Sequence, residues 1–135
     1  MVLVVDTSAV VCIAIGEEDA EHYASALSLA ATKLLPAPAY LECAMVLSGR
    51  LGMGSTDRLV DVLKSADISI EPFTPEMAQL AVDAFHSYGK GRHKAGLNFG
   101  DCFVYGTAKA LGLPLLYKGN DFALTDIASA FAQAS

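Results

Sequence analysis

The chain has 135 residues, 53% of them hydrophobic, and a formal net charge of −6 at pH 7. This length predicts a single domain over residues 1–135, and the lack of a long apolar run or a signal segment predicts a cytoplasmic protein without membrane spans. The acidic balance excludes a general nucleic-acid coat protein, but it leaves open a nuclease whose carboxylate pocket contributes negative charge.

The first eight residues predict a buried strand that ends at a carboxylate. Residues 2–5 are an unbroken apolar and mostly β-branched run, typical of a strand covered on both faces of a parallel sheet. Asp6 follows at the C-terminal end of this strand, where ligand sites form in open α/β sheets. Thr7 and Ser8 can cap the next helix. Asp6 itself keeps two interpretations, as a helix cap or as a chemical group.

The stretch from residue 9 to residue 66 predicts four helices and one strand. In chain order these are helices over 9–15 and about 17–31, a strand over 33–36, and helices over 40–50 and about 54–66. Pro36 and Pro38 separate the strand from the third helix, because the residue before a proline disfavours helical geometry. This start places Glu42 in the first turn of its helix, where an acid either pairs with the helix dipole or belongs to a site.

The second half predicts two strands and three helices around a basic loop. In chain order the sequence favours a strand over 68–70, a helix over 74–88, a helix over 102–111, a strand over 114–117, and a small-residue helix or tail over 124–134 that Asp126 caps. Three glycines and the only dense group of basic residues make 89–96 a flexible loop, called the basic loop below. Asp101 lies where a helix starts, and Asp121 follows the last strand.

The alternation of strands and helices predicts a three-layer α/β/α sandwich with a mainly parallel central sheet. In such a sheet the C-terminal ends of the strands over 2–5 and 114–117 lie at the same edge. The helices that start near residues 42 and 101 point their N-termini to that edge as well. Four acids can therefore converge there, namely Asp6, Glu42, Asp101 and Asp121.

Four converging carboxylates predict a site for hard divalent cations. Like charges packed together cannot all ionise cheaply without a cation, and oxygen ligands suit Mg²⁺, which keeps positions open for phosphate oxygens. Two such ions about 3.5–4 Å apart would activate a water for in-line displacement on phosphorus. The chain offers no nucleophile elbow and no glycine-rich phosphate loop. Its three cysteines lack zinc or disulfide spacing, and their flanks predict small buried thiols.

Four short motifs together resemble the PIN-domain ribonucleases, and most closely the VapC-like toxins of bacterial toxin–antitoxin pairs. They are Asp6-Thr7-Ser8-Ala9, Glu42 in an apolar helix after Pro38, Asn98-Phe99-Gly100-Asp101-Cys102, and Gly119-Asn120-Asp121-Phe122. The resemblance covers essentially the whole chain. It implies a dimeric endoribonuclease that depends on Mg²⁺ or Mn²⁺, inhibits growth, and is held inactive by a cognate antitoxin whose C-terminal segment covers the active groove.

The resemblance also implies roles for individual residues. The catalytic, metal-holding acidic tetrad corresponds to Asp6, Glu42, Asp101 and Asp121, and Asp126 is a candidate accessory acid. We expect substrate-positioning roles for Thr7, Ser8, Asn98, Asn120, Lys90, Arg92 and Lys94. The last three belong to the basic loop, which either holds phosphates that flank the scissile one or is an ordinary solvated loop.

Two other functions fit part of this pattern. A phosphatase-type domain also places an Asp after its first strand, but residue 8 is Ser and not the second Asp of an Asp-x-Asp pattern. Lys118, near a strand end, leaves open the variant that uses a catalytic lysine. The other alternative is a catalytically silent PIN-like module that only binds protein, which would not need all four acids.

Apolar surfaces predict two kinds of association. A chain this rich in Ala, Val, Leu and Met carries more apolar side chains than a monomer of its size readily buries, so we expect a homodimer. We expect the antitoxin segment to dock as an amphipathic helix or an extended piece in an apolar groove that leads to the acids. A tightly packed monomer with an alanine-rich core is the alternative that composition leaves open.

Overall fold

The computed structural model describes residues 1–131, whose strands form one four-stranded sheet. The strands are β1 (Val2–Val5), β2 (Thr32–Pro36), β3 (Ile68–Glu71) and β4 (Leu115–Leu116). The order across the sheet is β3-β2-β1-β4 and every neighbouring pair is parallel, so the predicted parallel sheet is confirmed. β1, the most apolar strand, lies inside the sheet, where Val4 and Val5 are fully buried.

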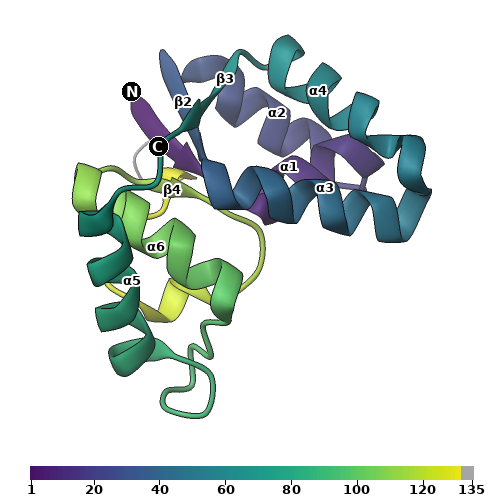
Figure 1. The fold of residues 1–135 in the computed structure, drawn as a ribbon. Coiled ribbons are helices and arrows are strands. Elements are labelled where there is room, and N and C mark those ends of the chain that lie inside the picture. The colour runs from purple at the N-terminus through teal and green to yellow at the C-terminus, as the bar shows by residue number, and fades with distance from the viewer. Residues whose placement is uncertain (132–135) are drawn as a thin grey trace.

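Six helices connect and cover the strands in the described part of the chain. They are α1 (Thr7–Ile15), α2 (Ala20–Leu29), α3 (Ala37–Leu51), α4 (Thr56–Ser65), α5 (Pro75–Tyr88) and α6 (Phe99–Leu111), with short 3-10 turns η1 (Met53–Ser55) and η2 (Phe122–Leu124). In Figure 1, α5 and α6 lie together on one side of the sheet, while α1, α2 and α4 group on the other. α3 contacts both groups, which completes the three layers.

A glycine allows the two helices of the first group to pack closely. A Cβ atom at Gly106 of α6 would collide with the backbone carbonyl oxygen of Met77 in α5. Only a residue without a side chain therefore permits this helix crossing. The close packing holds α6, and with it Asp101, in a fixed position against α5.

No helix within residues 1–131 is long and apolar enough to span a membrane.

Three helices begin earlier than predicted: α1 begins at Thr7 and not at residue 9, and the changes in α3 and α6 concern the acids. α3 begins at Ala37 with Pro38 as its second residue, so Glu42 lies in the second turn and the first-turn prediction is wrong. A proline is tolerated there because the N–H groups of the first turn have no partner inside the helix. α6 begins at Phe99 and not at 102, which makes Asp101 its third residue.

The chain after α6 is less regular than predicted. The strand predicted over 114–117 shortens to β4, Leu115–Leu116. In place of a continuous helix from 124, an irregular segment pairs with β4 through a single bridge between Leu115 and Ser129. The backbone N–H of Leu115 donates to the carbonyl of Ala128 at 2.9 Å. The rest of the predicted 124–134 helix, from 132, lies outside the described residues.

The three cysteines are free and buried, as their apolar flanks predict. Cys12 lies in α1, Cys43 in α3 and Cys102 in α6. Burial raises the pKa of the Cys43 thiol to about 12, with smaller contributions from the negative charges of Asp6 and Glu42. This thiol is therefore neutral at physiological pH and behaves as a small apolar side chain next to the acids.

Candidate active site

Asp6 directly follows β1 and caps α1, so its interpretation as a helix cap is confirmed. Its backbone N–H donates to the carbonyl of Leu116 in β4 at 2.9 Å, which ties the ends of the two strands together. Its carboxylate oxygen Oδ2 accepts from the backbone N–H of Ser8 at 3.0 Å and from the Ser8 hydroxyl at 2.5 Å. The other oxygen, Oδ1, takes no part in the cap. Asp6 can therefore stabilise the helix and still offer an oxygen to a ligand.

The two hydroxyl residues after Asp6 hold carboxylates in place. Thr7 Oγ1 donates to Oε1 of Glu42 at 2.6 Å, which fastens α3 to the start of α1. Ser8 Oγ donates to Asp6 and accepts from the backbone N–H of Lys118 at 2.9 Å. Ser8 thus links the segment after β4 to the end of β1. In this structure, both predicted positioning residues position the acids themselves.

Glu42 lies directly on the first turn of α6. A Cβ atom at Gly100 would collide with the Glu42 carboxylate. The first turn of a helix presents unpaired N–H groups and the positive end of the helix dipole, so an anion is favoured there. Gly100 is absent from the residues for which the sequence predicts a role. The signal that could have found it is a glycine inside a helix, where glycine lowers stability unless a close contact requires it.

Asp101 is held at the start of α6 by reciprocal hydrogen bonds with Asn98. The Asn98 side chain accepts from the Asp101 backbone N–H at 2.9 Å, and Oδ2 of Asp101 accepts from the Asn98 backbone N–H at 3.0 Å. Burial raises the pKa of Asp101 to about 7, and the negative charges of Asp6, Asp121 and Glu42 raise it as well. All four predicted acids are therefore close enough to interact electrostatically.

Asp121 and Asn120 lie on the exposed turn that follows β4. Asp121 precedes η2, and its side chain makes no capping hydrogen bond there. Because β1 and β4 are parallel neighbours, this turn leaves the sheet at the same edge as Asp6. The structure brings Asp121 toward the other acids, while the exposed Asn120 side chain faces solvent beside them.

The crowded acids fit a hard divalent cation. Burial also raises the pKa of Asp6 to about 6, and the charge of Glu42 adds to the rise, although hydrogen bonds from Ser8 oppose it. Raised pKa values in one pocket are typical of carboxylates that lack a compensating cation. Within residues 1–131, no group of three or more His, Cys, Asp or Glu side chains is already arranged to hold a metal ion. The oxygen-only donor set nevertheless fits Mg²⁺ or Mn²⁺ better than softer ions.

The basic loop connects α5 to the start of α6 (Figure 1). Lys90, Arg92 and Lys94 are all exposed or partly exposed. The Arg92 guanidinium lies 4.9 Å from the ring centroid of Phe85, a cation–π contact at the end of α5. No ion pair within the described residues joins these three side chains to an acid. Their charges therefore remain available on the surface near α6.

Lys118 forms ion pairs with two acids other than Asp6. Its ammonium group pairs with Glu17 at 3.0 Å and with Asp19 at 2.8 Å. The phosphatase alternative needs a lysine that acts beside the first-strand carboxylate. The ion pairs with the segment before α2 leave Lys118 without that role in this structure.

Asp126 belongs to a separate surface network. Its carboxylate accepts from the Tyr105 hydroxyl at 2.6 Å and pairs with the Lys109 ammonium at 2.7 Å. The cap predicted for Asp126 is therefore wrong, because its oxygens hold α6 side chains and not a helix start. Both contacts hold the Asp126 carboxylate against α6 side chains and not against the four acids.

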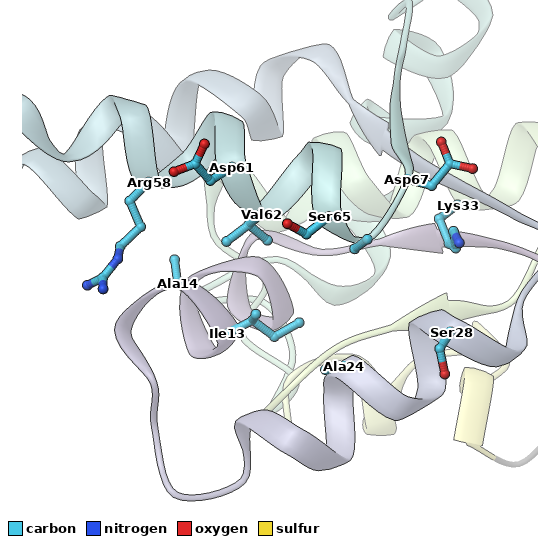
Figure 2. A pocket seen from close by; sticks show the side chains of 11 residues that line it. Ile13, Ala14, Ala24, Ser28, Lys33, Arg58, Asp61, Val62, Ser65 and Asp67 are labelled. Carbon is cyan, nitrogen blue, oxygen red and sulfur yellow. The ribbon is translucent and has the colours of Figure 1, made fainter.

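Two apolar hollows lie beside the first residues of α6. One, of about 440 Å³, is lined by Glu42 and apolar residues of α3 and by Phe99 and Phe103 of α6. The other, of about 530 Å³, lies between α5 and α6 and includes Phe99, Phe103 and Lys90. A third hollow, of about 480 Å³, lies between α2 and α4, with Arg58 and Lys33 at its two ends (Figure 2). None of the predicted site residues lines this third hollow.

The chain matches known proteins over nearly its whole length. The family model described as PIN domain matches residues 3–128. The chain is 43% identical over 127 residues to VapC ribonuclease Mb0640 of Mycobacterium bovis and to Ribonuclease VapC30 of Mycobacterium tuberculosis, covering 94% of this chain and 97% of each relative. It is 42% identical over 127 residues to Ribonuclease VapC of Mycolicibacterium smegmatis, covering 94% of this chain and 98% of that relative.

A solved structure shares the fold. It is the crystal structure of Mycobacterium tuberculosis VapC20, described as a sarcin-ricin loop cleaving toxin. The two structures agree with a TM-score of 0.76 over 93% of this chain and 96% of that chain. Their sequence identity is 15%, so this similarity concerns the fold alone.

Proposed function

This chain belongs to the PIN-domain family, and from that membership we propose that it is an endoribonuclease that hydrolyses RNA phosphodiester bonds as the toxin of a toxin–antitoxin pair. The relatives that cover almost all of the chain carry the name VapC ribonuclease. The observation that carries the proposal is the meeting of four carboxylates at one edge of the sheet, where three of them raise the pKa of the fourth, Asp101.

Asp6, Glu42, Asp101 and Asp121 are the residues that would hold Mg²⁺ or Mn²⁺. Such a cation, when bound, supplies an activated water and stabilises the negative charge that develops on the phosphate oxygens. The chain provides the oxygen ligands and their orientation. Burial of Asp6 and Asp101 makes their charged forms unfavourable without a cation, which favours binding of a positive charge at this edge.

The chain's own residues would prepare this site in three ways. Thr7 fixes the Glu42 carboxylate, and Ser8 fixes Asp6 against the segment that leads to Asp121. Asn98 fixes the start of α6 and therefore Asp101. We propose that these hydrogen bonds hold the acids at a spacing that suits a phosphodiester, so that little rearrangement is needed when RNA binds.

Lys90, Arg92 and Lys94 would hold the RNA backbone. Positive side chains bind phosphates without reading the bases, and they offset the repulsion between an acidic protein and RNA. Their exposure and lack of acidic partners within the described residues support this role. Asn120, exposed beside Asp121, is a candidate to contact a phosphate or a ribose on the other side of the acids.

The association partners that we propose are a second copy of the chain and a cognate antitoxin. Leu41 and Met45 on α3 and Met53 just after it are 61%, 66% and 85% exposed, which is unusual for large apolar side chains and supports a contact between copies. The hollow beside Glu42 is lined by this carboxylate and by apolar residues of α3 and α6. An antitoxin segment that fills this hollow would block access of RNA to the site.

The test is incubation of the purified protein with total RNA, with and without Mg²⁺ or Mn²⁺, followed by mapping of new 5′ ends. We expect discrete new ends only when the cation is present, and none with Asp101→Asn. Co-expression with the product of a small reading frame directly upstream should suppress the cuts. Metal-independent cuts, or equal cutting by the Asn variant, would mean that the acids do not carry the activity.

A further inference from the structure

Phe99, the first residue of α6, is an exposed aromatic side chain at the edge of the site. Its side chain is 82% exposed, whereas the neighbouring Leu97 and Cys102 are 1% and 8% exposed. A phenylalanine in water contributes nothing to the core and adds apolar surface. Its position is therefore better explained by something that covers the ring than by folding.

Other aromatic rings support Phe99 from behind. The Phe103 ring packs edge to face against it, with centroids 4.6 Å apart. Phe103 in turn packs edge to face against Phe73, with centroids 5.1 Å apart. Such contacts restrict the motion of a ring and are favourable in themselves. Phe99 is thus exposed and yet supported, as a surface that receives a flat ligand needs to be.

The surroundings of Phe99 combine apolar space, a cation and the acids. Both hollows at the start of α6 share Phe99 and Phe103 as walls. One of these hollows contains Lys90 and the other contains the Glu42 carboxylate. Phe99 also directly precedes Gly100, on which Glu42 lies. A ligand on this ring would therefore lie beside the Glu42 carboxylate.

We propose that Phe99 stacks against one unpaired nucleobase of the RNA substrate, next to the phosphodiester that is cleaved. The inference rests on the proposed ribonuclease function and adds the way in which the site holds its substrate. A nucleobase has a flat π-face that suits an aromatic ring, and the phosphate attached to it suits Lys90. Stacking requires the base to be unpaired, so the site prefers single-stranded segments and loops to intact duplex.

A second copy of the chain, or the antitoxin segment proposed for the hollow beside Glu42, could also cover this ring through apolar contact. Phe99 shares one hollow with Leu41, Met45 and the Glu42 carboxylate and a second hollow with Lys90, and this cation favours the nucleobase, because a phosphate is attached to every nucleoside of RNA. A contact between copies needs only apolar bulk, whereas stacking needs a flat ring. The two explanations therefore predict different outcomes for leucine at position 99.

The experiment measures the affinity of purified protein for single-stranded RNA oligonucleotides, by fluorescence anisotropy, in an Asp101→Asn background that leaves the RNA intact. Phe99→Ala should weaken binding between about fivefold and about 150-fold, the range found when one stacked base loses its aromatic partner. Phe99→Leu should weaken it to a similar degree, and Phe99→Trp should retain it. Leu29→Ala removes another exposed apolar side chain, 74% exposed on α2, and should leave the affinity unchanged.

A scan with abasic nucleotides identifies the stacked base. Removing the base should weaken binding at one position of the oligonucleotide, and that penalty should disappear in Phe99→Ala. Unchanged affinity of Phe99→Ala, full affinity of Phe99→Leu, or a penalty that persists at every position would overturn the proposal. So would light scattering in which Phe99→Ala alone turns a dimer into a monomer. Parental protein that still cuts RNA in these cases would leave the ribonuclease assignment standing.

Discussion

At the scale of single residues, Gly100 leaves open the space at the start of α6 that the Glu42 carboxylate occupies. In Gly100→Ala the new methyl group would collide with the Glu42 carboxylate, which must then move away from α6. From the proposed catalytic role of Glu42 we expect RNA cleavage to fall by about tenfold to a hundredfold, because a misplacement of about 1 Å can cost about a hundredfold. The measurement is the initial cleavage rate at saturating Mg²⁺, together with the thermal unfolding midpoint.

Gly49→Ala is the matched control for this substitution. Gly49 also lies in a helix, α3, and a Cβ atom there would meet nothing within 4 Å. This variant should keep full activity and gain about 0.5–1 kcal/mol, the usual advantage of alanine inside a helix. If Gly100→Ala cleaves RNA as fast as Gly49→Ala, the contact with Glu42 is not needed for catalysis.

Removal of a single acid separates activity from folding. Asp6→Asn or Asp101→Asn should abolish RNA cleavage and leave the circular dichroism spectrum unchanged. Without metal, each variant should be more stable than the parent by about 1–3 kcal/mol at pH 7, because a neutral amide avoids burial of charge beside other acids. Glu18→Gln, an acid outside the site, should change neither property. Full activity in both site variants contradicts the assigned tetrad.

At the scale of elements, the basic loop tests how RNA is held. Replacing Lys90, Arg92 and Lys94 by alanine should weaken binding of unrelated RNA sequences alike. It should also flatten the dependence of log affinity on log salt by about 0.7 for each phosphate of a single strand that the variant no longer binds. RNA affinity is measured at several salt concentrations in the Asp101→Asn background. Metal affinity should stay the same, because none of the three side chains is a proposed ligand.

The control for the loop carries the same change in net charge elsewhere. Arg50, Arg58 and Lys64 come from the end of α3 and from α4. Their replacement by alanine should leave the salt dependence near the parental slope. If the two triple variants behave alike, RNA responds only to the overall charge of the protein and the loop is an ordinary connection.

The boundaries of the helices and strands differ in how well the sequence predicts them. The apolar run that stops at a charged residue predicts β1 at Val2–Val5, and the structure agrees. The start of α3 comes earlier than the sequence predicts, because Pro38 does not mark a boundary in a helix that accepts proline in its first turn. β4 is shorter than its apolar run because strand length depends on the neighbouring strands, which no local pattern describes.

At the scale of the whole molecule, the acids should make the stability of the metal-free protein depend on pH. The pKa of Asp6 is raised to about 6 and that of Asp101 to about 7, from an ordinary value of 3.8 for both. The folded state therefore binds more protons than the unfolded state between about pH 4 and pH 7, and stability should fall as pH rises through this range. Urea unfolding in a chelator at several pH values measures the effect, which Asp101→Asn should reduce.

Added metal should reverse this trend. Mg²⁺ or Mn²⁺ binds the folded protein, and free ion at tenfold above its dissociation constant adds about 1.4 kcal/mol of stability. The gain should be largest near neutral pH, where the acids are charged, and should disappear in Asp101→Asn. A parent protein whose unfolding midpoint is the same with Mg²⁺, Mn²⁺ and chelator would contradict the proposed metal site.

The proposed homodimer is tested by the mass in solution. Light scattering at micromolar concentration should give the mass of two chains for the parent. Met45→Asp places a charge in the exposed apolar surface of α3 and should give the mass of one chain. Leu29→Asp, a comparable change on α2, should remain dimeric. A parent with the mass of one chain refutes the dimer.

Topology makes the meeting of the acids predictable, whereas their exact contacts are not. Parallel strands place Asp6 and the turn with Asp121 at one edge, whatever the side chains between them are. The hydrogen bond from Thr7 to Glu42 depends on how α3 crosses α1, and the exposure of Phe99 depends on how α6 packs on α5. Such relations between distant helices leave no periodic pattern in a sequence. The catalytic role of the four acids stays a prediction.

Modification of the buried cysteines by a thiol reagent can measure local opening of this protein. A thiol reagent can modify Cys43 only when α3 separates from its neighbours, because the side chain is fully buried next to the acids. Cys12, which is also fully buried, reports in the same way on α1. Labelling rates in the native state therefore give an opening free energy for α3 and for α1 without any engineered probe. A cation that draws the acids together should slow labelling of Cys43 more than that of Cys12.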